Sequence, residues 1–168
     1  MFKKIEQFLP LIIIVSSLLM AIMIFFPALS DGEDYLIKGT TTVFGGELVS
    51  FGSLMNVSVN FNFINLLAYG LPFLLSIILF TVNVRTSKKG LVKLILSVLL
   101  LVSFLLSLIV FISLGSYTIV TTEIFNGSGT SDLGGYSLAV GAIISLVLSV
   151  IGIVSSTLHL LITASLKS

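Results

Sequence analysis

The chain of 168 residues is 57% hydrophobic and only 9% charged. Soluble domains carry about 25% charged residues, so this composition indicates a protein embedded in a membrane. A net charge of +1 gives no basis for nucleic-acid binding, and the lack of cysteine excludes disulfides, thiolate metal sites and cysteine lipidation.

Four apolar stretches are each long enough to cross a bilayer as a helix. They comprise residues 8–29, 63–84, 91–114 and 136–164. A hydrocarbon core about 30 Å thick requires about 20 helical residues. None of the four stretches contains an acidic residue. The sequence therefore predicts an all-α four-helix membrane bundle.

The first stretch has an alternative interpretation as a cleaved signal peptide. Residues 1–4 are basic, and Ala28-Leu29-Ser30 resembles a small-x-small cleavage site. The apolar run before that site, however, is longer than the roughly 7–15 residues of a typical signal peptide. We therefore expect a retained helix.

The basic residues predict the orientation of the bundle, because cytoplasmic loops carry an excess of Lys and Arg. Of the eight basic residues, only Lys38 lies on the opposite side of the predicted spans from the others. Those others are Lys3, Lys4, Arg85, Lys88, Lys89, Lys93 and Lys167. This distribution predicts a multi-pass protein of the cell membrane with cytoplasmic N- and C-termini.

The external stretch 35–62 has the pattern of three antiparallel strands. Gly45-Gly46 and Gly52-Ser53 are both two-residue signals for hairpin turns. If both turns form, Leu48 lies opposite Val57. A disordered polar loop is the alternative interpretation of this stretch.

This pairing predicts a sheet with one apolar and one polar face. The apolar face collects Tyr35, Ile37, Val43, Leu48, Met55, Val57, Val59 and Phe61. The polar face collects Lys38, Thr40, Thr42, Glu47, Asn56, Ser58, Asn60 and Asn62, and is interrupted by Phe44, Val49 and Phe51. Because an apolar face must be covered, we expect the helix ends beneath the sheet to cover it.

The second external stretch, 117–125, is rich in β-branched and aromatic residues and predicts a fourth strand on an edge of the first three. The Gly- and Ser-rich residues 126–131 are expected to be flexible. Asn62 or Asn65 is expected to cap the helix that follows the third strand. The predicted fold is thus a four-helix membrane bundle capped by a small extracytoplasmic antiparallel β-sheet.

Small residues recur in the fourth span at a spacing that places them along one stripe of the helix. They are Ser137, Gly141, Ser145 and Ser149, with Gly152 and Ser156 on an adjoining line. Small residues let helix backbones approach closely in a membrane. The stripe indicates helix packing within the bundle, or alternatively a dimerisation face between subunits.

Ionisable residues suited to chemistry are scarce. His159 is the only histidine, and we expect it at the headgroup level near the inner end of its helix. We also expect that no base lies beside the serines of the membrane spans. No second His and no Cys is present to complete a metal site. Asp31, Glu33 and Asp34 match no calcium-loop spacing and are expected to be solvated. The sequence predicts neither an enzyme nor a cofactor.

In its layout the chain resembles the claudin-like four-helix membrane proteins: cytoplasmic termini, a long first external segment with β-strands and a shorter second one. It is also similar to small four-helix membrane proteins of bacteria with AT-rich genomes. Claudin-like proteins carry a tryptophan-rich signature and a cysteine pair in the first external segment, and this chain has neither Trp nor Cys. The resemblance implies a layout and no residue roles.

We therefore expect a non-enzymatic, accessory membrane protein whose external sheet contacts other membrane proteins or a second copy, with lipid around its helices. Phe44, Val49 and Phe51 form the expected contact patch, because exposed aromatic side chains anchor many interfaces. Burial of this patch beneath the second external segment is the alternative. A small transporter or channel subunit is the rival function, which the lack of charged residues near the middle of the spans disfavours.

Overall fold

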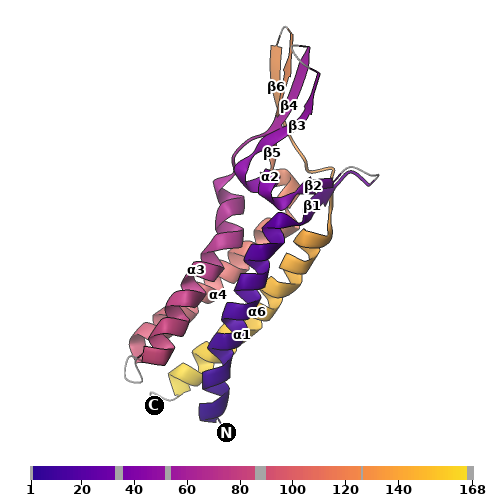
Figure 1. The fold of residues 1–168 in the computed structure, drawn as a ribbon. Coiled ribbons are helices and arrows are strands. Elements are labelled where there is room, and N and C mark those ends of the chain that lie inside the picture. The colour runs from indigo at the N-terminus through magenta and orange to yellow at the C-terminus, as the bar shows by residue number, and fades with distance from the viewer. Residues whose placement is uncertain (1, 33–35, 52–53, 86–89, 126, 166–168) are drawn as a thin grey trace.

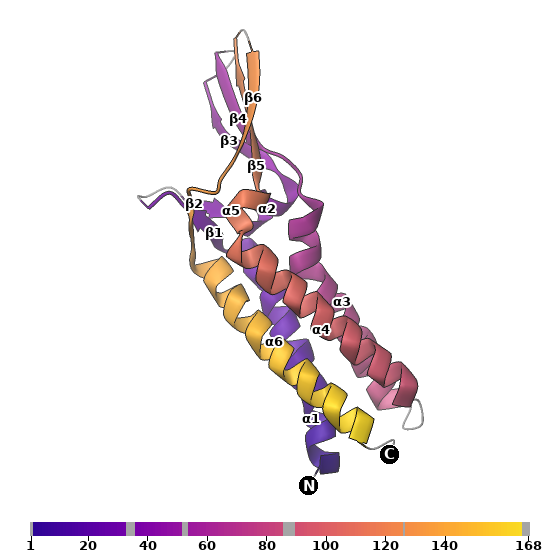
Figure 2. The same ribbon diagram turned by 180° about the vertical axis from the view of Figure 1, so that it is seen from behind.

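The computed structural model describes residues 2–32, 36–51, 54–85, 90–125 and 127–165. Within these ranges, four helices are long and apolar enough to cross a membrane. They are α1 (Phe2–Ile22), α3 (Phe63–Arg85), α4 (Gly90–Ile112) and α6 (Val140–Ser165). The helices form a bundle in which each packs mainly against two neighbours, in the cyclic order α1, α3, α4, α6 (Figure 1 and Figure 2).

Several residues named in the predictions lie outside the described ranges. They are Glu33, Asp34, Tyr35, Gly52, Ser53, Lys88, Lys89, Asn126 and Lys167.

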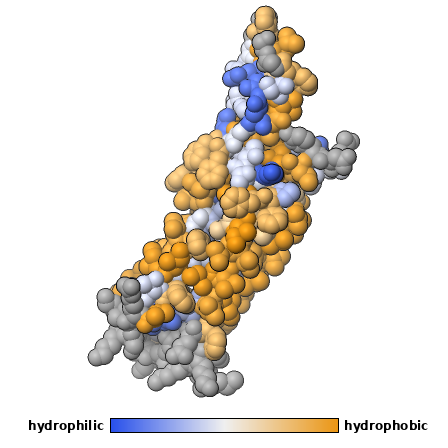
Figure 3. Space-filling model, viewed as in Figure 1, coloured by the Kyte–Doolittle hydropathy of each residue, from blue (hydrophilic) through white to orange (hydrophobic). Residues whose placement is uncertain are grey.

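Each long helix is apolar on its outward face as well as on the face that it buries. Leu79, Leu100 and Phe104 are completely buried between the helices. Many apolar side chains of these helices are nevertheless exposed, and most of the bundle surface on the face that Figure 3 shows is hydrophobic. Helices that are apolar all round suit surroundings of lipid. The structure therefore agrees with the prediction of a multi-pass membrane bundle.

The first helix ends earlier than predicted. After α1, Met23–Phe25 form one turn of 3-10 helix, and Pro27–Ser30 form strand β1. Proline has no backbone N–H to donate, and it also disfavours helical geometry in the residue before it. Phe26 is accordingly extended, with φ −97° and ψ 163°. The predicted helix 8–29 is wrong for its last residues for this reason.

A small sheet joins the C-terminal end of α1 to the N-terminal end of α6. Its strand order is β2 (Leu36–Lys38), β1, β7 (Ser137–Leu138), with both pairs antiparallel. The fourth span, predicted from residue 136, therefore becomes helical only at Val140, because the residues before it pair with β1. The sequence does not predict this small sheet, because its strands are only two to four residues long.

The first predicted hairpin does not exist. Residues Gly39–Phe44 form the short helix α2, where the sequence predicted a strand. Gly45 ends this helix with φ +79°, and its N–H donates to the carbonyl of Thr41. Glycine adopts a positive φ readily because it has no Cβ, whereas other residues rarely do. In the structure Gly45 of the Gly45-Gly46 pair thus marks the end of a helix. From composition alone, a Gly-Gly pair that ends a helix cannot be distinguished from one that forms a hairpin turn.

The larger sheet has four antiparallel strands in the order β3-β4-β5-β6. They are β3 (Gly46–Ser50), β4 (Met55–Val59), β5 (Ile119–Ile124) and β6 (Gly127–Asp132). β5 lies within the stretch predicted as a strand and pairs with β4. The following residues were expected to be flexible, but 127–132 pair with β5 as β6.

A bulge alters the predicted pairing between β3 and β4. Glu47 pairs with Ser58, but Val49, rather than Leu48, pairs with Val57. The register shifts between Glu47 and Val49, so that the strand holds one extra residue there. Val49 consequently lies on the same face as Val57 and not on the polar face to which the sequence assigned it.

The four-stranded sheet projects away from the bundle (Figure 1 and Figure 2). Only its base is buried: Val59 and Val120 are 3% and 4% exposed, whereas Ile124 at the far end is 59% exposed. A strand advances about 3.3 Å per residue, so five residues carry the outer half beyond the reach of the helices. The expectation that the helix ends cover the apolar face is right for the base and wrong for the outer half.

Two asparagines connect the sheet to the bundle. The side-chain oxygen of Asn62 accepts from the N–H groups of Ile64 (2.9 Å) and Asn65 (3.1 Å), which makes Asn62 the N-cap of α3. Asn65 is completely buried and donates to the carbonyl of Thr42 (2.9 Å) and the hydroxyl of Thr118 (3.3 Å). One side chain of α3 thus holds α2 and the start of β5.

Candidate functional site

The projecting sheet has one predominantly apolar face. Directly opposite residues in an antiparallel sheet point to the same side. Val49 lies opposite Val57, and Val57 lies opposite Thr122. In the next row towards the tip, Met55 lies opposite Ile124. Residues of these two rows alternate with polar ones along their strands, which gives the sheet a distinct apolar side.

The other face is polar and acidic. Asn56 pairs with Glu123, which pairs with Ser128. Glu47 pairs with Ser58 in a further row of this face. The two carboxylates therefore lie on the side opposite the apolar rows, and the two faces differ sharply in chemistry.

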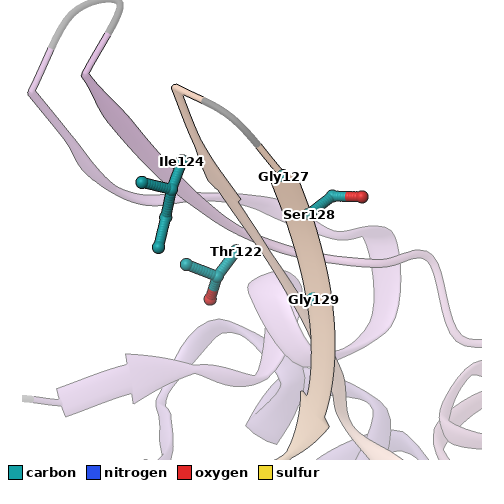
Figure 4. Close-up of a pocket in the computed structure, with 5 residues that line it drawn as sticks. All are labelled: Thr122, Ile124, Gly127, Ser128 and Gly129. Carbon is teal, nitrogen blue, oxygen red and sulfur yellow. The ribbon is translucent and has the colours of Figure 1, made fainter.

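Two glycines of β6 leave part of the apolar face open. Thr122, Ile124, Gly127, Ser128 and Gly129 line an open pocket at this edge of the sheet. Figure 4 shows Thr122 and Ile124 pointing to one side of the sheet and Ser128 to the other. Because Gly127 lies opposite Ile124 and has no side chain, β6 does not cover the isoleucine.

The far end of the sheet carries further exposed apolar side chains. Phe51 and Leu54 are each 65% exposed, and Phe125 is 75% exposed. The N–H of Phe125 donates to the carbonyl of Leu54 (3.3 Å), which holds the two hairpin ends together. Phe51, two residues after Val49, continues the apolar face, whereas Leu54 and Phe125 stand one residue beyond Met55 and Ile124 and add exposed apolar area at the tip itself. We call Val49, Phe51, Leu54, Met55, Val57, Ile124 and Phe125 together the outer apolar surface.

The predicted patch is only partly assembled. Phe44 ends α2 at the base of the sheet, whereas Phe51 follows β3 at its far end. Five strand residues separate them by roughly 17 Å at about 3.3 Å per residue. Val49 and Phe51 belong to the outer apolar surface, and Phe44 does not. Leu54, Ile124 and Phe125 were missed because their proximity depends on pairing between distant segments.

The small residues of the fourth span lie against other segments of the same chain. In α6, Gly141, Ser145, Ser149, Gly152 and Ser156 are all buried. A Cβ on Gly141 would lie 2.7 Å from the carbonyl oxygen of Pro27, and one on Gly152 would lie 2.3 Å from the ring of Phe104. Ser137 instead belongs to β7, where its hydroxyl donates to the carbonyl of Ser30 (3.1 Å).

The structure corrects the placement of the only histidine. His159 is completely buried between the helices, not exposed at the headgroup level. Its Nδ1 lies 2.7 Å from the hydroxyl of Ser97 on α4. A serine and a base therefore do meet inside the bundle, contrary to the sequence prediction, because a contact across 62 residues of chain leaves no local pattern.

The geometry of this pair is that of a structural hydrogen bond. The Ser97 hydroxyl also lies 2.7 Å from the carbonyl of Lys93, which accepts its single proton. In that arrangement the hydroxyl oxygen accepts from Nδ1–H of the imidazole. A serine nucleophile requires the reverse arrangement, in which the imidazole nitrogen takes the hydroxyl proton.

The acidic cluster that the sequence places after the first span is only partly described. Asp31 follows β1, and its predicted companions Glu33 and Asp34 are outside the described ranges. Among the residues that the structure describes, no group of three or more His, Cys, Asp or Glu side chains is placed to hold a metal ion.

Comparison of the chain with known protein families, with curated protein sequences and with solved structures gives no match.

Proposed function

We propose that this chain is a non-enzymatic, accessory protein of the cell membrane that binds protein through the outer apolar surface. In this proposal both termini are cytoplasmic, as the basic residues predict, and the four-stranded sheet stands outside the cell membrane. The contacting protein is another membrane protein or a second copy of the chain.

One observation carries the proposal. The outer apolar surface stands away from the bundle, and Phe51, Leu54 and Phe125 remain 65–75% exposed there. Exposed apolar patches on the water-facing part of a protein mark contact sites, since they cost free energy until they are covered. Aromatic side chains such as these two phenylalanines are typical anchors of such contacts.

The location of charge supports a protein partner. Glu47 and Glu123 lie on the opposite face of the sheet, so a partner can cover the apolar rows without burying a carboxylate. Burying an unpaired charge is costly, and interface centres are accordingly poor in charged residues. The open edge of β6, lined by Gly127 and Gly129, leaves room for a side chain of the partner over Ile124.

Transport is less well supported by the interior of the bundle. Ser103, Ser107 and Ser145 are buried, but their hydroxyls donate to helix carbonyls within 2.9 Å. A hydroxyl that donates its proton to a helix carbonyl has no proton left to donate to a transported solute.

Photo-crosslinking from two neighbouring positions tests the proposal. A photoreactive amino acid at Ile124 reports on the apolar face, and the same amino acid at Glu123 reports on the polar face of the same strand. In intact cells we expect strong adducts from position 124 and weak ones from position 123. An adduct of twice the chain's 18.0 kDa identifies a second copy, and another mass identifies a different protein.

The companion variant Phe51→Ser with Phe125→Ser should abolish the adduct from position 124 while leaving the melting temperature in detergent nearly unchanged, because both side chains are mostly exposed. Equal adducts from both positions, or none from either in cells that express the protein, would reject the proposed interface.

A further inference from the structure

The last strand of the projecting sheet has one edge without a neighbouring strand. In the sheet order β3-β4-β5-β6, β6 pairs with β5 on one side, and none of the described residues pairs with it on the other. β6 is exposed along its whole length. Alternate residues of such an edge strand direct their backbone N–H and C=O groups outward, where a further strand can pair with them.

The edge of β6 lacks the features that commonly protect edge strands. Bulges, prolines and lysines prevent unwanted pairing in many sheets. β6 contains neither proline nor lysine, and its pairing with β5 runs without a shift from residue 127 to residue 132. The strand at the opposite edge, β3, instead has a bulge between Glu47 and Val49. Addition of a strand is therefore favoured at β6.

The two faces beside this edge determine which side chains an added strand can carry. On the apolar side, Gly127 and Gly129 have no side chains, so a residue of the added strand can contact Ile124 through the open pocket (Figure 4). On the polar side, the short side chain of Ser128 lies opposite Glu123. Side chains of a strand alternate between the two faces. An added strand thus fits best with apolar residues on one side and long basic residues, which reach over Ser128, on the other.

The charge of this end of the molecule also favours a basic partner. Among the described residues that connect the long helices here, Lys38 is the one basic residue. The acidic residues of the same segments are Asp31, Glu47, Glu123 and Asp132. A second copy would bring the same excess of carboxylates to the contact, and like charges on adjacent strands destabilise pairing. The charge therefore indicates a different protein as the occupant.

We propose that the partner is a different protein that adds an extended segment, in which apolar residues alternate with Lys or Arg, to the edge of β6. In this mode of binding, main-chain hydrogen bonds supply affinity and alternate side chains supply specificity. The apolar side chains cover Ile124, and the basic ones lie near Glu123 and Asp132. The inference rests on the proposed function, because it specifies the chemistry of the protein that covers the outer apolar surface.

Two synthetic peptides test the proposal on the purified full-length protein in uncharged detergent. Lys alternates with Val in one short peptide, and Glu alternates with Val in the other. By fluorescence anisotropy we expect the Lys-Val peptide to bind and the Glu-Val peptide not to bind. Hydrogen–deuterium exchange should slow in β6 when the Lys-Val peptide is bound. Added salt should weaken this binding, because exposed charges are screened.

Three variants locate the contact on the polar face. Glu123→Gln removes the carboxylate beside β6 and should weaken binding of the Lys-Val peptide about twofold to fivefold, the usual range for an exposed ion pair. Glu47→Gln is the matched control, because Glu47 lies on the same face but at the opposite edge of the sheet, and it should leave binding unchanged. Glu123→Lys should reverse the preference, so that the Glu-Val peptide binds more tightly.

A Lys-Val peptide that does not bind, or that binds without slowing exchange in β6, would overturn the proposal. Equal losses from Glu123→Gln and Glu47→Gln would also overturn it, as would a photo-crosslinked adduct from position 124 with the mass of two copies. A protein adduct from position 124 combined with failure of the peptide at β6 rejects strand addition and leaves the proposed function standing. Absence of any adduct from position 124 rejects the proposed function itself.

Discussion

At the scale of single residues, the small side chains of α6 matter for the space that they leave to their neighbours. The ring of Phe104 on α4 fills the position where a Cβ of residue 152 would stand, at distances of 2.3–2.5 Å. Phe104 is completely buried and has little freedom to move aside. In a membrane, where lipid is as apolar as the interior, such close packing is a main source of stability.

Gly152→Ala is therefore expected to destabilise the bundle by about 1–3 kcal/mol, the usual cost of overpacking a filled core. The measurement is the melting temperature in detergent. Gly70→Ala on α3 is the matched control, because nothing lies within 4 Å of its added Cβ. The double variant Gly152→Ala with Phe104→Leu should recover part of the loss. A full-size effect at Gly70, or none at Gly152, would contradict this packing.

The sequence predicts a stripe of small residues, but not which helix fills it. A spacing of four residues is the same whether the neighbour is α1, α4 or another subunit. The hydrogen bond between Ser97 and His159 is likewise invisible in the sequence, because it joins two helices through a single contact. Contacts of this kind depend on how helices rotate against each other, which local patterns do not encode.

At the scale of elements, Asn65 couples the sheet to the bundle. Its amide donates to Thr42 in α2 and to Thr118 just before β5, two segments far apart in the sequence. Without these hydrogen bonds, the Thr42 carbonyl would lack this donor, at a cost of about 1–3 kcal/mol for a buried group. The sequence predicts Asn62 or Asn65 as the cap of α3, and in the structure Asn62 caps the helix while Asn65 holds α2 and the start of β5.

Asn65→Leu should accordingly loosen α2 and the base of β4 and β5 more than the rest of the helices. Hydrogen–deuterium exchange should accelerate in residues 39–44 and 119–121, while α4 and α6 keep their protection. Asn83→Leu, near the other end of α3, serves as the control for introducing leucine into the same helix. Uniform acceleration throughout the bundle would show that Asn65 supports the whole fold and not this junction.

The elements themselves differ in how far the sequence predicts them. Long apolar helices are recognisable because length and composition both indicate them. The short helix 39–44 is not recognisable from the sequence, because its β-branched threonines favour a strand. Only Gly45 after it is typical of a helix end. The bulge in β3 is also unpredictable from alternation alone, although it decides that Val49 faces the apolar side.

At the scale of the whole molecule, the chain combines a lipid-facing bundle with a sheet that extends beyond it (Figure 1). The predicted direction of this arrangement follows from the distribution of Lys and Arg. Everything proposed for the outer apolar surface depends on that direction, because the surface must face the compartment in which its partner lies.

Cysteine labelling in intact cells is the most direct test of this central claim. The chain has no native cysteine, so each introduced thiol is the only one that reacts. With a membrane-impermeant maleimide, cysteines at Ser50 in β3 and Ser128 in β6 should be labelled without cell lysis. A cysteine at Ser87, between α3 and α4, should be labelled only after lysis. Labelling of position 87 alone in intact cells would place the sheet in the cytoplasm and contradict the account.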